Sequence, residues 1–234
     1  SDIARASGNL STSYYIYSKQ ESDVYQTKNR YILSWEHDAI DKTNFVDNLK
    51  AKIYYQDYET RDYWNEFQAE KYFFGRLLNQ DRDVYSRYKL TDDSYGLDLQ
   101  LGSTINNHQL TYGVDYSLTS NEYYQDKYTI TNGTESHTYF RTDYPIKRSP
   151  DTDTQRLGVY IQDEFVNGKT EFIYGVRFDN YQLNASPDSL YLNYCQVDSS
   201  TCPVADLDSS SFTPKIAATH NISDQLKIWG QYSR

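Results

Sequence analysis

The stretch RLGVYIQDEFVNGKTEFIYGVRFDNYQL, residues 156–183, decides the fold because apolar and polar residues alternate through two runs on either side of VNGK. Successive side chains of a β-strand point to opposite faces, so each run predicts a strand with one apolar face. The short, glycine-containing connection predicts an antiparallel hairpin. The apolar set is Leu157, Val159, Ile161, Phe172, Tyr174, Val176 and Phe178, and the opposite set includes Arg156, Gln162, Glu164, Arg177 and Asp179.

The same alternation recurs over most of the chain and predicts an all-β fold. Together with the two strands above it gives about nine strands, arranged as an antiparallel up-and-down meander. The other predicted strands are residues 10–18, 29–37, 49–56, 95–101, 108–118, 212–220 and 226–232.

The composition of the 234-residue chain excludes several classes of protein. With 26 Tyr, 9 Phe and 3 Trp it is too aromatic for a disordered chain. A net charge of -10, with no long basic run, argues against a nucleic-acid partner. No run approaches the roughly 20 apolar residues of a membrane helix, so any membrane segment must be a strand.

The connections between the predicted strands fall into two unlike groups. Residues 103–107, 166–169 and 221–225 are short turns, whereas long loops are predicted at about 59–83, 119–152 and 184–209. Short turns at one rim and long loops at the other are typical of a transmembrane β-barrel, with periplasmic turns, extracellular loops, an apolar outer face and a polar interior. The best strands run to about twelve residues, near the length that a tilted strand needs to cross a membrane.

A resemblance to a known family supports this interpretation. Residues 156–183, the following SFTPKIAATHNISDQLKIWGQYSR (211–234) and the earlier NHQLTYGVDYS (107–117) resemble strands in the barrel of TonB-dependent outer-membrane receptors. The resemblance covers about residues 30–234, with the pieces in the family's order. It is closest to the branch that takes haem or iron from haemoglobin, transferrin, lactoferrin or haemophores.

The resemblance implies that residues 1–234 are a portion of a 22-stranded barrel in the bacterial outer membrane, with no plug domain visible in them. It implies uptake and not catalysis, with contact to outer-membrane lipid and to the TonB complex through a region outside this sequence. The expected partner is a haem- or iron-carrying protein such as haemoglobin, a haemophore or a transferrin-like protein. Haem would be cargo, and no intrinsic cofactor is expected. Two alternatives remain, a siderophore receptor of the same fold and a soluble secreted β-domain acting as an adhesin or lectin.

Residues 137–141, within the predicted loop 119–152, carry the groups that a haem ligand requires. A haem iron accepts an imidazole or a phenolate, the ring packs on aromatic side chains, and the propionates pair with cations. The same residues would also suit an ordinary solvated loop. The predicted ligand-binding residues are His137, Tyr139, Phe140 and Arg141.

The predicted loop 59–83 is rich in aromatic residues. Trp64, Phe67, Phe74 and Leu78 recur near helical spacing, which suggests a short amphipathic helix. Exposed aromatic and arginine side chains anchor protein interfaces, although these could equally form the loop's own core. The candidates for contact with a protein partner are Tyr63, Trp64, Phe67, Phe73, Phe74 and Arg76.

Cys195 and Cys202 lie close together in a segment rich in Ser, Asp and Pro. This predicts a disulfide in an oxidising compartment, with a pair of free thiols as the alternative. No second pair completes a zinc site, no nucleophile motif accompanies the four histidines, and no calcium-loop pattern is found. The sequence therefore predicts neither a catalytic nor a metal site.

Overall fold

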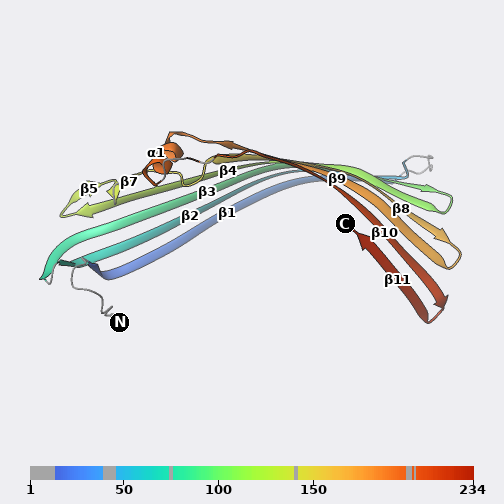
Figure 1. The fold of residues 1–234 in the computed structure, drawn as a ribbon, viewed down its shortest axis with the longest axis horizontal. Coiled ribbons are helices and arrows are strands. Elements are labelled where there is room, and N and C mark those ends of the chain that lie inside the picture. The colour runs from blue at the N-terminus through green and yellow to red at the C-terminus, as the bar shows by residue number, and fades with distance from the viewer. Residues whose placement is uncertain (1–13, 39–45, 74–75, 140–141, 199–201, 203) are drawn as a thin grey trace.

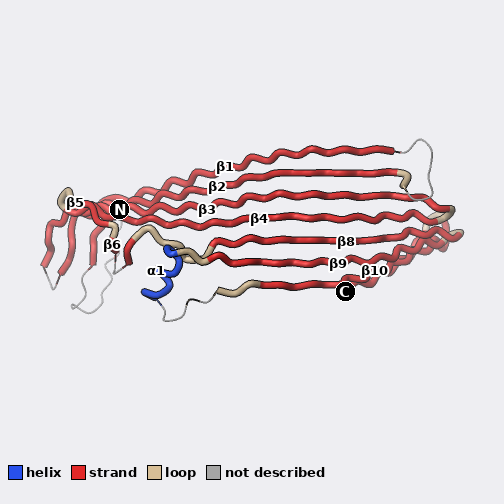
Figure 2. The backbone as a smooth tube through the Cα atoms, turned by 90° about the horizontal axis from the view of Figure 1, so that it is seen from above, coloured by secondary structure: helices blue, strands red, loops and turns tan. Residues whose placement is uncertain are grey.

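The computed structural model describes residues 14–38, 46–73, 76–139, 142–198, 202 and 204–234, and for residues 14–18 and 69–80 the backbone alone. It contains a sheet in the order β1-β2-β3-β4-β8-β9-β10-β11, in which every neighbouring pair is antiparallel, with β5 pairing β4 as its ninth strand (Figures 1 and 2). The predicted meander of about nine strands is confirmed. The long strands are β1 (Tyr14–Asp38), β2 (Asn48–Phe73), β3 (Arg76–Ile105), β4 (His108–Thr131), β8 (Asp151–Asn167), β9 (Thr170–Ser186), β10 (Leu207–Ser223) and β11 (Leu226–Ser233).

The smaller elements lie between β4 and β10. They are β5 (Thr134–Ser136), β6 (Thr138–Tyr139), β7 (Thr142–Asp143) and α1 (Ser189–Asp198). In Figure 1 α1 lies near β7 and far from the tight turns. Within the described part of the chain, no helix is both long and apolar enough to cross a membrane.

All three predicted short turns are confirmed, and each has only two residues. They join β3 to β4 at 106–107, β8 to β9 at 168–169 and β10 to β11 at 224–225. Asn106 and Gly168 have φ of 54° and 59°, the left-handed backbone that tight hairpin turns require. These turns define one end of the sheet, here named the turn end, and the opposite end is named the long end.

Two predicted boundaries are wrong. Residues 59–83 are not a loop with a helical turn, because β2 and β3 continue through them as paired strands on both sides of residues 74–75. β4 likewise runs on to Thr131, well into the predicted loop 119–152. Residues 14–18 of the strand predicted at 10–18 belong to the same strand as residues 29–37, namely β1, and residues 10–13 lie outside the described residues. The predicted loop 184–209 contains α1.

The register lines up the apolar residues of successive strands in continuous rows. One row runs through Trp35, Ala51, Leu99, Val114, Val159, Phe178 and Phe212, seven strands in succession. The next residues along each strand form a polar row on the opposite side, which includes Lys52, Asp98, Asp115 and Asp179. The side of the Val159 row is named the outer face and that of the Asp115 row the inner face.

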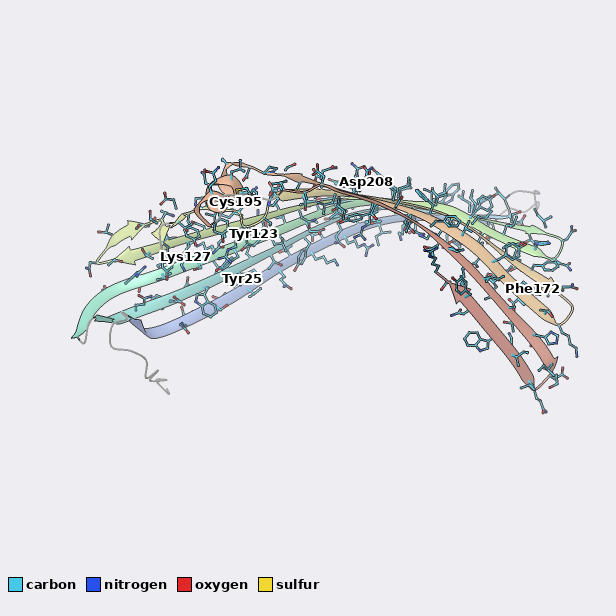
Figure 3. The ribbon with its side chains drawn as sticks, in the orientation of Figure 1. Tyr25, Tyr123, Lys127, Phe172, Cys195 and Asp208 are labelled. Atoms are coloured by element: carbon cyan, nitrogen blue, oxygen red, sulfur yellow. A yellow bond between two sulfur atoms is a disulfide. The ribbon has the colours of Figure 1, made fainter. Side chains whose placement is uncertain are left out.

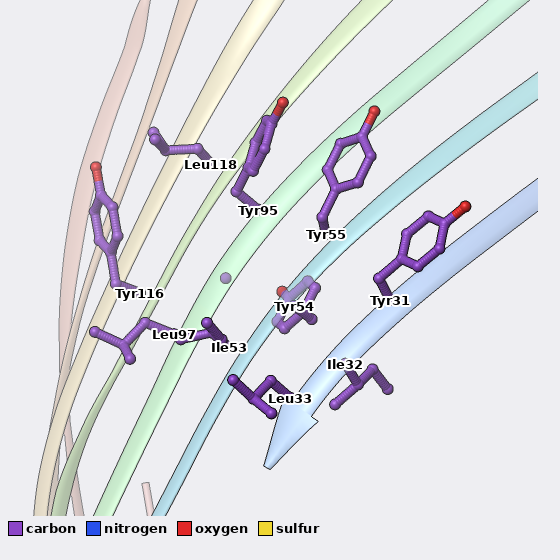
Figure 4. Close-up of a pocket in the computed structure, with 11 residues that line it drawn as sticks. Tyr31, Ile32, Leu33, Ile53, Tyr54, Tyr55, Tyr95, Leu97, Tyr116 and Leu118 are labelled. Carbon is purple, nitrogen blue, oxygen red and sulfur yellow. The ribbon is translucent and has the colours of Figure 1, made fainter. Parts of the chain in front are cut away.

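Aromatic side chains mark both limits of the apolar band on the outer face. Toward the long end Tyr31, Tyr55 and Tyr95 are neighbours in one row, with ring centroids 6.3 and 4.8 Å apart (Figure 4). At the turn end the rings of His108 and Phe165 are stacked with centroids 4.5 Å apart. Two aromatic rows bounding an apolar band are the pattern of a strand wall that crosses a membrane.

The limit of the apolar band toward the long end lies at different rows on the two sides of the sheet. On β4 it lies at Leu118, in the row of the three tyrosines, whereas on β9 and β10 it lies at Phe178 and Phe212, two rows nearer the turn end. Barrel strands are tilted by about 35–45°. A boundary parallel to the membrane therefore crosses the rows diagonally, and the shift follows from that tilt.

A single sheet buries few side chains, and those that are buried lie toward the long end. The buried apolar residues among those described are Val84, Ile146, Tyr191 and Cys195. Val84 belongs to β3, whereas the other three come from the connection before β8 and from α1. The only packed layer in the described residues is thus a small one beyond the tyrosine row.

Candidate functional site

Strands β1–β4 extend far past the tyrosine row at the long end. The part of them beyond Tyr31, Tyr55 and Tyr95, here named the projection, comprises residues 14–30, 56–73, 76–94 and 119–131. From Arg76 to Ser94 it contains 19 residues of β3, roughly 60 Å along the strand at about 3.3 Å per residue. The strands β8–β10 have only 17 residues each, so the rim of the sheet is high on one side and low on the other.

Residues 138–139 and 142–150 lie along the β4 edge of the projection, where an isolated β-bridge joins Gln125 to Ile146. Gln125 and Ile146 exchange backbone hydrogen bonds of 2.9 and 2.8 Å. The Ile146 side chain is 1% exposed. These contacts hold the segment that carries Tyr139, Lys147 and Arg148 against the projection.

A buried cation joins this segment to α1. Lys147 is 9% exposed, pairs with Asp151 and places Nζ 2.9 Å from Asp188 Oδ2. Burial opposes the ionised form of Asp188, but hydrogen bonds from Lys147 and from backbone amides outweigh it and lower the pKa of Asp188. The Tyr191 amide donates to Asp188 Oδ1 over 2.9 Å, which caps the helix. A disulfide between Cys195 and Cys202 ties α1 to the chain that follows.

Cations and an aromatic ring converge on the inner face of the projection. Lys127 Nζ lies 3.6 Å from the ring centroid of Tyr139, and Arg82 Cζ lies 5.3 Å from the same centroid. Burial lowers the pKa of Lys127, and the nearby charges of Arg82 and Arg148 lower it further against the opposing effect of Glu66. Positive charge is therefore concentrated around the half-buried side chain of Lys127, which Figure 3 labels.

Further tyrosine hydroxyls lie near Arg148, the third cation of this region. Burial raises the pKa of Tyr123 and of Tyr144, with Tyr88 and Tyr194 adding to the shift and Arg148 opposing it. Tyr123 and Tyr144 therefore stay protonated at neutral pH and can donate hydrogen bonds. We name the group Arg82, Lys127, Arg148, Tyr139, Tyr123 and Tyr144 the mouth cluster.

The structure separates two of the predicted ligand-binding residues. His137 lies on the outer face, with Nδ1 3.4 Å from Asp126 and Nε2 3.0 Å from Glu135, and its ring is 5.5 Å from that of Tyr128. Tyr139 contacts Lys127, whose side chain points to the opposite face of β4. His137 and Tyr139 therefore do not form one site. Phe140 and Arg141 lie outside the described residues.

The predicted partner-contact residues also divide between the two faces. Tyr63 and Phe67 lie on the outer face, where Tyr63 meets Tyr25 edge to face at 5.7 Å and lies 5.9 Å from Arg87. Trp64 lies on the inner face and donates from Nε1 to Glu66 over 2.9 Å. The backbone positions of Phe73 and Arg76 end β2 and begin β3, and Phe74 lies outside the described residues.

Sequence reasoning missed Arg82 and Lys127, two of the three cations of the mouth cluster. Arg82, Lys127 and Arg148 are far apart in sequence and belong to no motif. Only the pairing of β3 with β4 and the fold of residues 138–150 bring them together. No group of three or more His, Cys, Asp or Glu residues suited to a metal ion occurs in the part of the chain that the structure describes.

Comparison with known proteins identifies the family. The family model described as "TonB dependent receptor-like, beta-barrel" matches residues 2–234. No curated protein sequence matches the chain. Among solved structures, the ferric preacinetobactin receptor BauA from Acinetobacter baumannii is 12% identical with a TM-score of 0.47, over 90% of this chain and 30% of that one.

Two further solved structures are similar. The ferric citrate transporter FecA is 13% identical with a TM-score of 0.38, over 79% of this chain and 26% of its own. The copper transporter OprC is 12% identical with a TM-score of 0.40, over 86% of this chain and 38% of its own. The chain thus spans about a third of the length of these proteins. Members of the matched family are bacterial outer-membrane transporters and not enzymes. The chain belongs to the TonB-dependent receptor family, as a portion of its outer-membrane β-barrel.

Proposed function

We propose that this portion captures ligand for a receptor that takes up haem, or iron from an iron-carrying protein, with energy supplied through TonB. The observation that carries the proposal is the mouth cluster, where cations and phenols meet on the inner face of the projection. An anionic metal chelate needs cations for its charge, phenols as hydrogen-bond donors and aromatic rings to pack against. Haem also accepts a phenolate as an iron ligand, a role that Tyr139 would fill.

The polar inner face below the cluster suits a water-lined passage. Arg177 Nη2 lies 2.9 Å from Asp115 Oδ2 and 2.7 Å from Asp179 Oδ1. Tyr160 donates to Gln100 over 3.4 Å, and this group borders a groove of about 540 Å³. A charged wall of this kind stays hydrated and gives an anionic ligand no apolar surface on which to be trapped.

The outer face of the projection suits a carrier protein as the source of the cargo. Tyr25 is 60% exposed beside Tyr63, and Arg87 donates to the Tyr128 hydroxyl over 2.9 Å. Tyrosine and arginine are the side chains most often found at the centre of protein interfaces. A sheet standing tens of ångströms above the membrane offers such a partner an accessible surface. His137, with two carboxylates beside it, is better placed for this surface than for an anionic chelate.

The test uses the full-length receptor in detergent, titrated with ferric haem while the Soret absorbance is followed. We expect saturable binding, with the spectrum changed by Tyr139→Phe and left unchanged by His137→Ala. Mixing the receptor with haemoglobin or a haemophore should yield a complex on size-exclusion chromatography, weakened by Tyr63→Ala. Absence of haem binding together with tight binding of a ferric siderophore would assign the receptor to the small-chelate class and overturn this proposal.

A further inference from the structure

The inner face of the projection holds buried amide groups beside the cations of the mouth cluster. Gln68 is 2% exposed and lies directly across from Arg82 in the pairing of β2 with β3. Gln125 is 1% exposed and lies two residues from Lys127, on the same face of β4. Both residues therefore flank the place where Arg82 and Lys127 approach Tyr139.

These amides have unmet hydrogen-bonding capacity within the described residues. Neither Oε1 nor Nε2 of Gln68, nor Oε1 of Gln125, has a partner there. An unmade hydrogen bond at a buried polar group is unfavourable by about 1–3 kcal/mol. The Gln68 amide N–H and the Arg82 guanidinium beside it are donors, which is the set that a carboxylate oxygen accepts.

We propose that Arg82, Lys127 and Gln68 form a carboxylate-binding subsite that holds the anionic edge of the transported chelate. The subsite rests on the proposed uptake function and adds the chemical group by which the cargo is recognised. Haem belongs to this class through its two propionates, and the ring would then lie toward the tyrosines. The carboxylate supplies an acceptor oxygen for Gln68 Nε2, which has none among the described residues.

The balance of charge around Lys127 agrees with an anionic occupant. The charges of Arg82 and Arg148 lower the pKa of Lys127, and the charge of Glu66 opposes them. Glu66 itself accepts hydrogen bonds from Trp64 Nε1 and from Gln20 Nε2. Because the site is half-buried, the attraction between its net positive charge and a carboxylate is screened less than on an open surface.

The experiment compares ferric haem with its dimethyl ester, in which both carboxylates are uncharged, for binding to the full-length receptor. A charge-assisted hydrogen bond contributes about 1.5–3 kcal/mol, so the wild type should prefer the acid over the ester by roughly ten- to a hundredfold. Lys127→Met, which keeps the length of the side chain, should abolish most of that preference by weakening the binding of the acid much more than that of the ester. Lys127→Arg should retain the preference.

The matched control is Lys89→Met, which removes a cation from the opposite face of β3, where Lys89 Nζ lies 3.1 Å from Glu59. This variant should keep the wild-type preference for the acid. Equal affinity of the wild-type receptor for acid and ester would overturn the subsite while leaving haem uptake intact. Failure to bind either form would overturn the proposed function and the subsite with it. An equal loss of preference in Lys89→Met would show a general charge effect and refute the assignment.

Discussion

A charge placed in the middle of the apolar band tests the assignment of the outer face to lipid. On β8 the outward residues run from Leu157 to Phe165, with Ile161 halfway between them. The one carboxylate among them, Asp163, is already paired, because it lies 2.7 Å from His108 Nδ1 and accepts a hydrogen bond from the Tyr174 hydroxyl. Ile161 is 47% exposed in the sheet and is paired with Tyr112 on β4 and Val176 on β9. Only lipid is left to cover it. We expect Ile161→Arg to destabilise the folded barrel strongly.

The magnitude follows from the depth of the residue. Eight steps from Leu157 to Phe165 at about 3.3 Å each span roughly 26 Å along the strand, or roughly 20 Å of depth at a tilt of about 40°. Ile161 then lies roughly 10 Å from either boundary, too deep for an arginine to extend fully into water. Arginine at the membrane midplane is unfavourable by about 2–4 kcal/mol, which lowers the folding equilibrium constant by roughly thirty- to a thousandfold.

The assay is reversible unfolding of the full-length receptor in lipid vesicles by denaturant, with Gln162→Arg as the control. Gln162 is the next residue on β8, faces inward and bonds to Glu164 over 3.0 Å, so an arginine there meets water and a carboxylate. Gly175, a neighbour of Gln162 on the same face, would be a worse control because a Cβ there would lie 2.9 Å from the Ile161 carbonyl oxygen. Equal destabilisation by the two arginines, or less than about 1 kcal/mol for Ile161→Arg, would refute the lipid-facing assignment.

Other predictions concern the α1 tie and a crowded glycine. Lys147→Met should speed hydrogen exchange in α1, because it leaves Asp188 without its buried cation. Since the pKa of Asp188 is lowered on folding, its contribution to stability is present above its ordinary pKa and lost as the pH falls through the lowered value. In Lys147→Met, the protection of α1 from hydrogen exchange should therefore fall less in acid than in the wild type. An acid profile unchanged by the substitution would contradict the stabilising role of the Lys147–Asp188 pair. Gly113→Ala should destabilise the barrel by roughly 1–3 kcal/mol, because the new Cβ would lie 2.4 Å from a backbone carbonyl and 2.7 Å from the Tyr160 hydroxyl. An effect below about 1 kcal/mol in the same unfolding assay would contradict the steric explanation.

The membrane-crossing part of the fold could be predicted because one face of each strand meets lipid and the other meets water. That difference produces the alternation seen in residues 156–183 and fixes which residues share a face. The two-residue turns could also be predicted from the sequence, since Asn106 and Gly168 suit the positive φ that such turns require.

The projection could not be predicted from alternation because both of its faces carry polar and aromatic residues. Tyr63 on the outer face and Trp64 on the inner face follow each other directly, so no period of two remains to be detected. The mouth cluster was hidden for a different reason. Its cations come from β3, β4 and the segment before β8, and only the register between β3 and β4 brings Arg82 and Lys127 to one ring.

The diagonal course of the apolar band changes how a substitution in this wall should be interpreted. Leu97 and Asn180 belong to one hydrogen-bonded row, yet the first lies within the band and the second beyond its limit. Residues of the same row are therefore surrounded by different media, hydrocarbon at Leu97 and water at Asn180. Tolerance to a polar side chain should follow lines oblique to the ladder, so a scan that groups positions by strand register would mix two environments that a scan grouped by depth would separate.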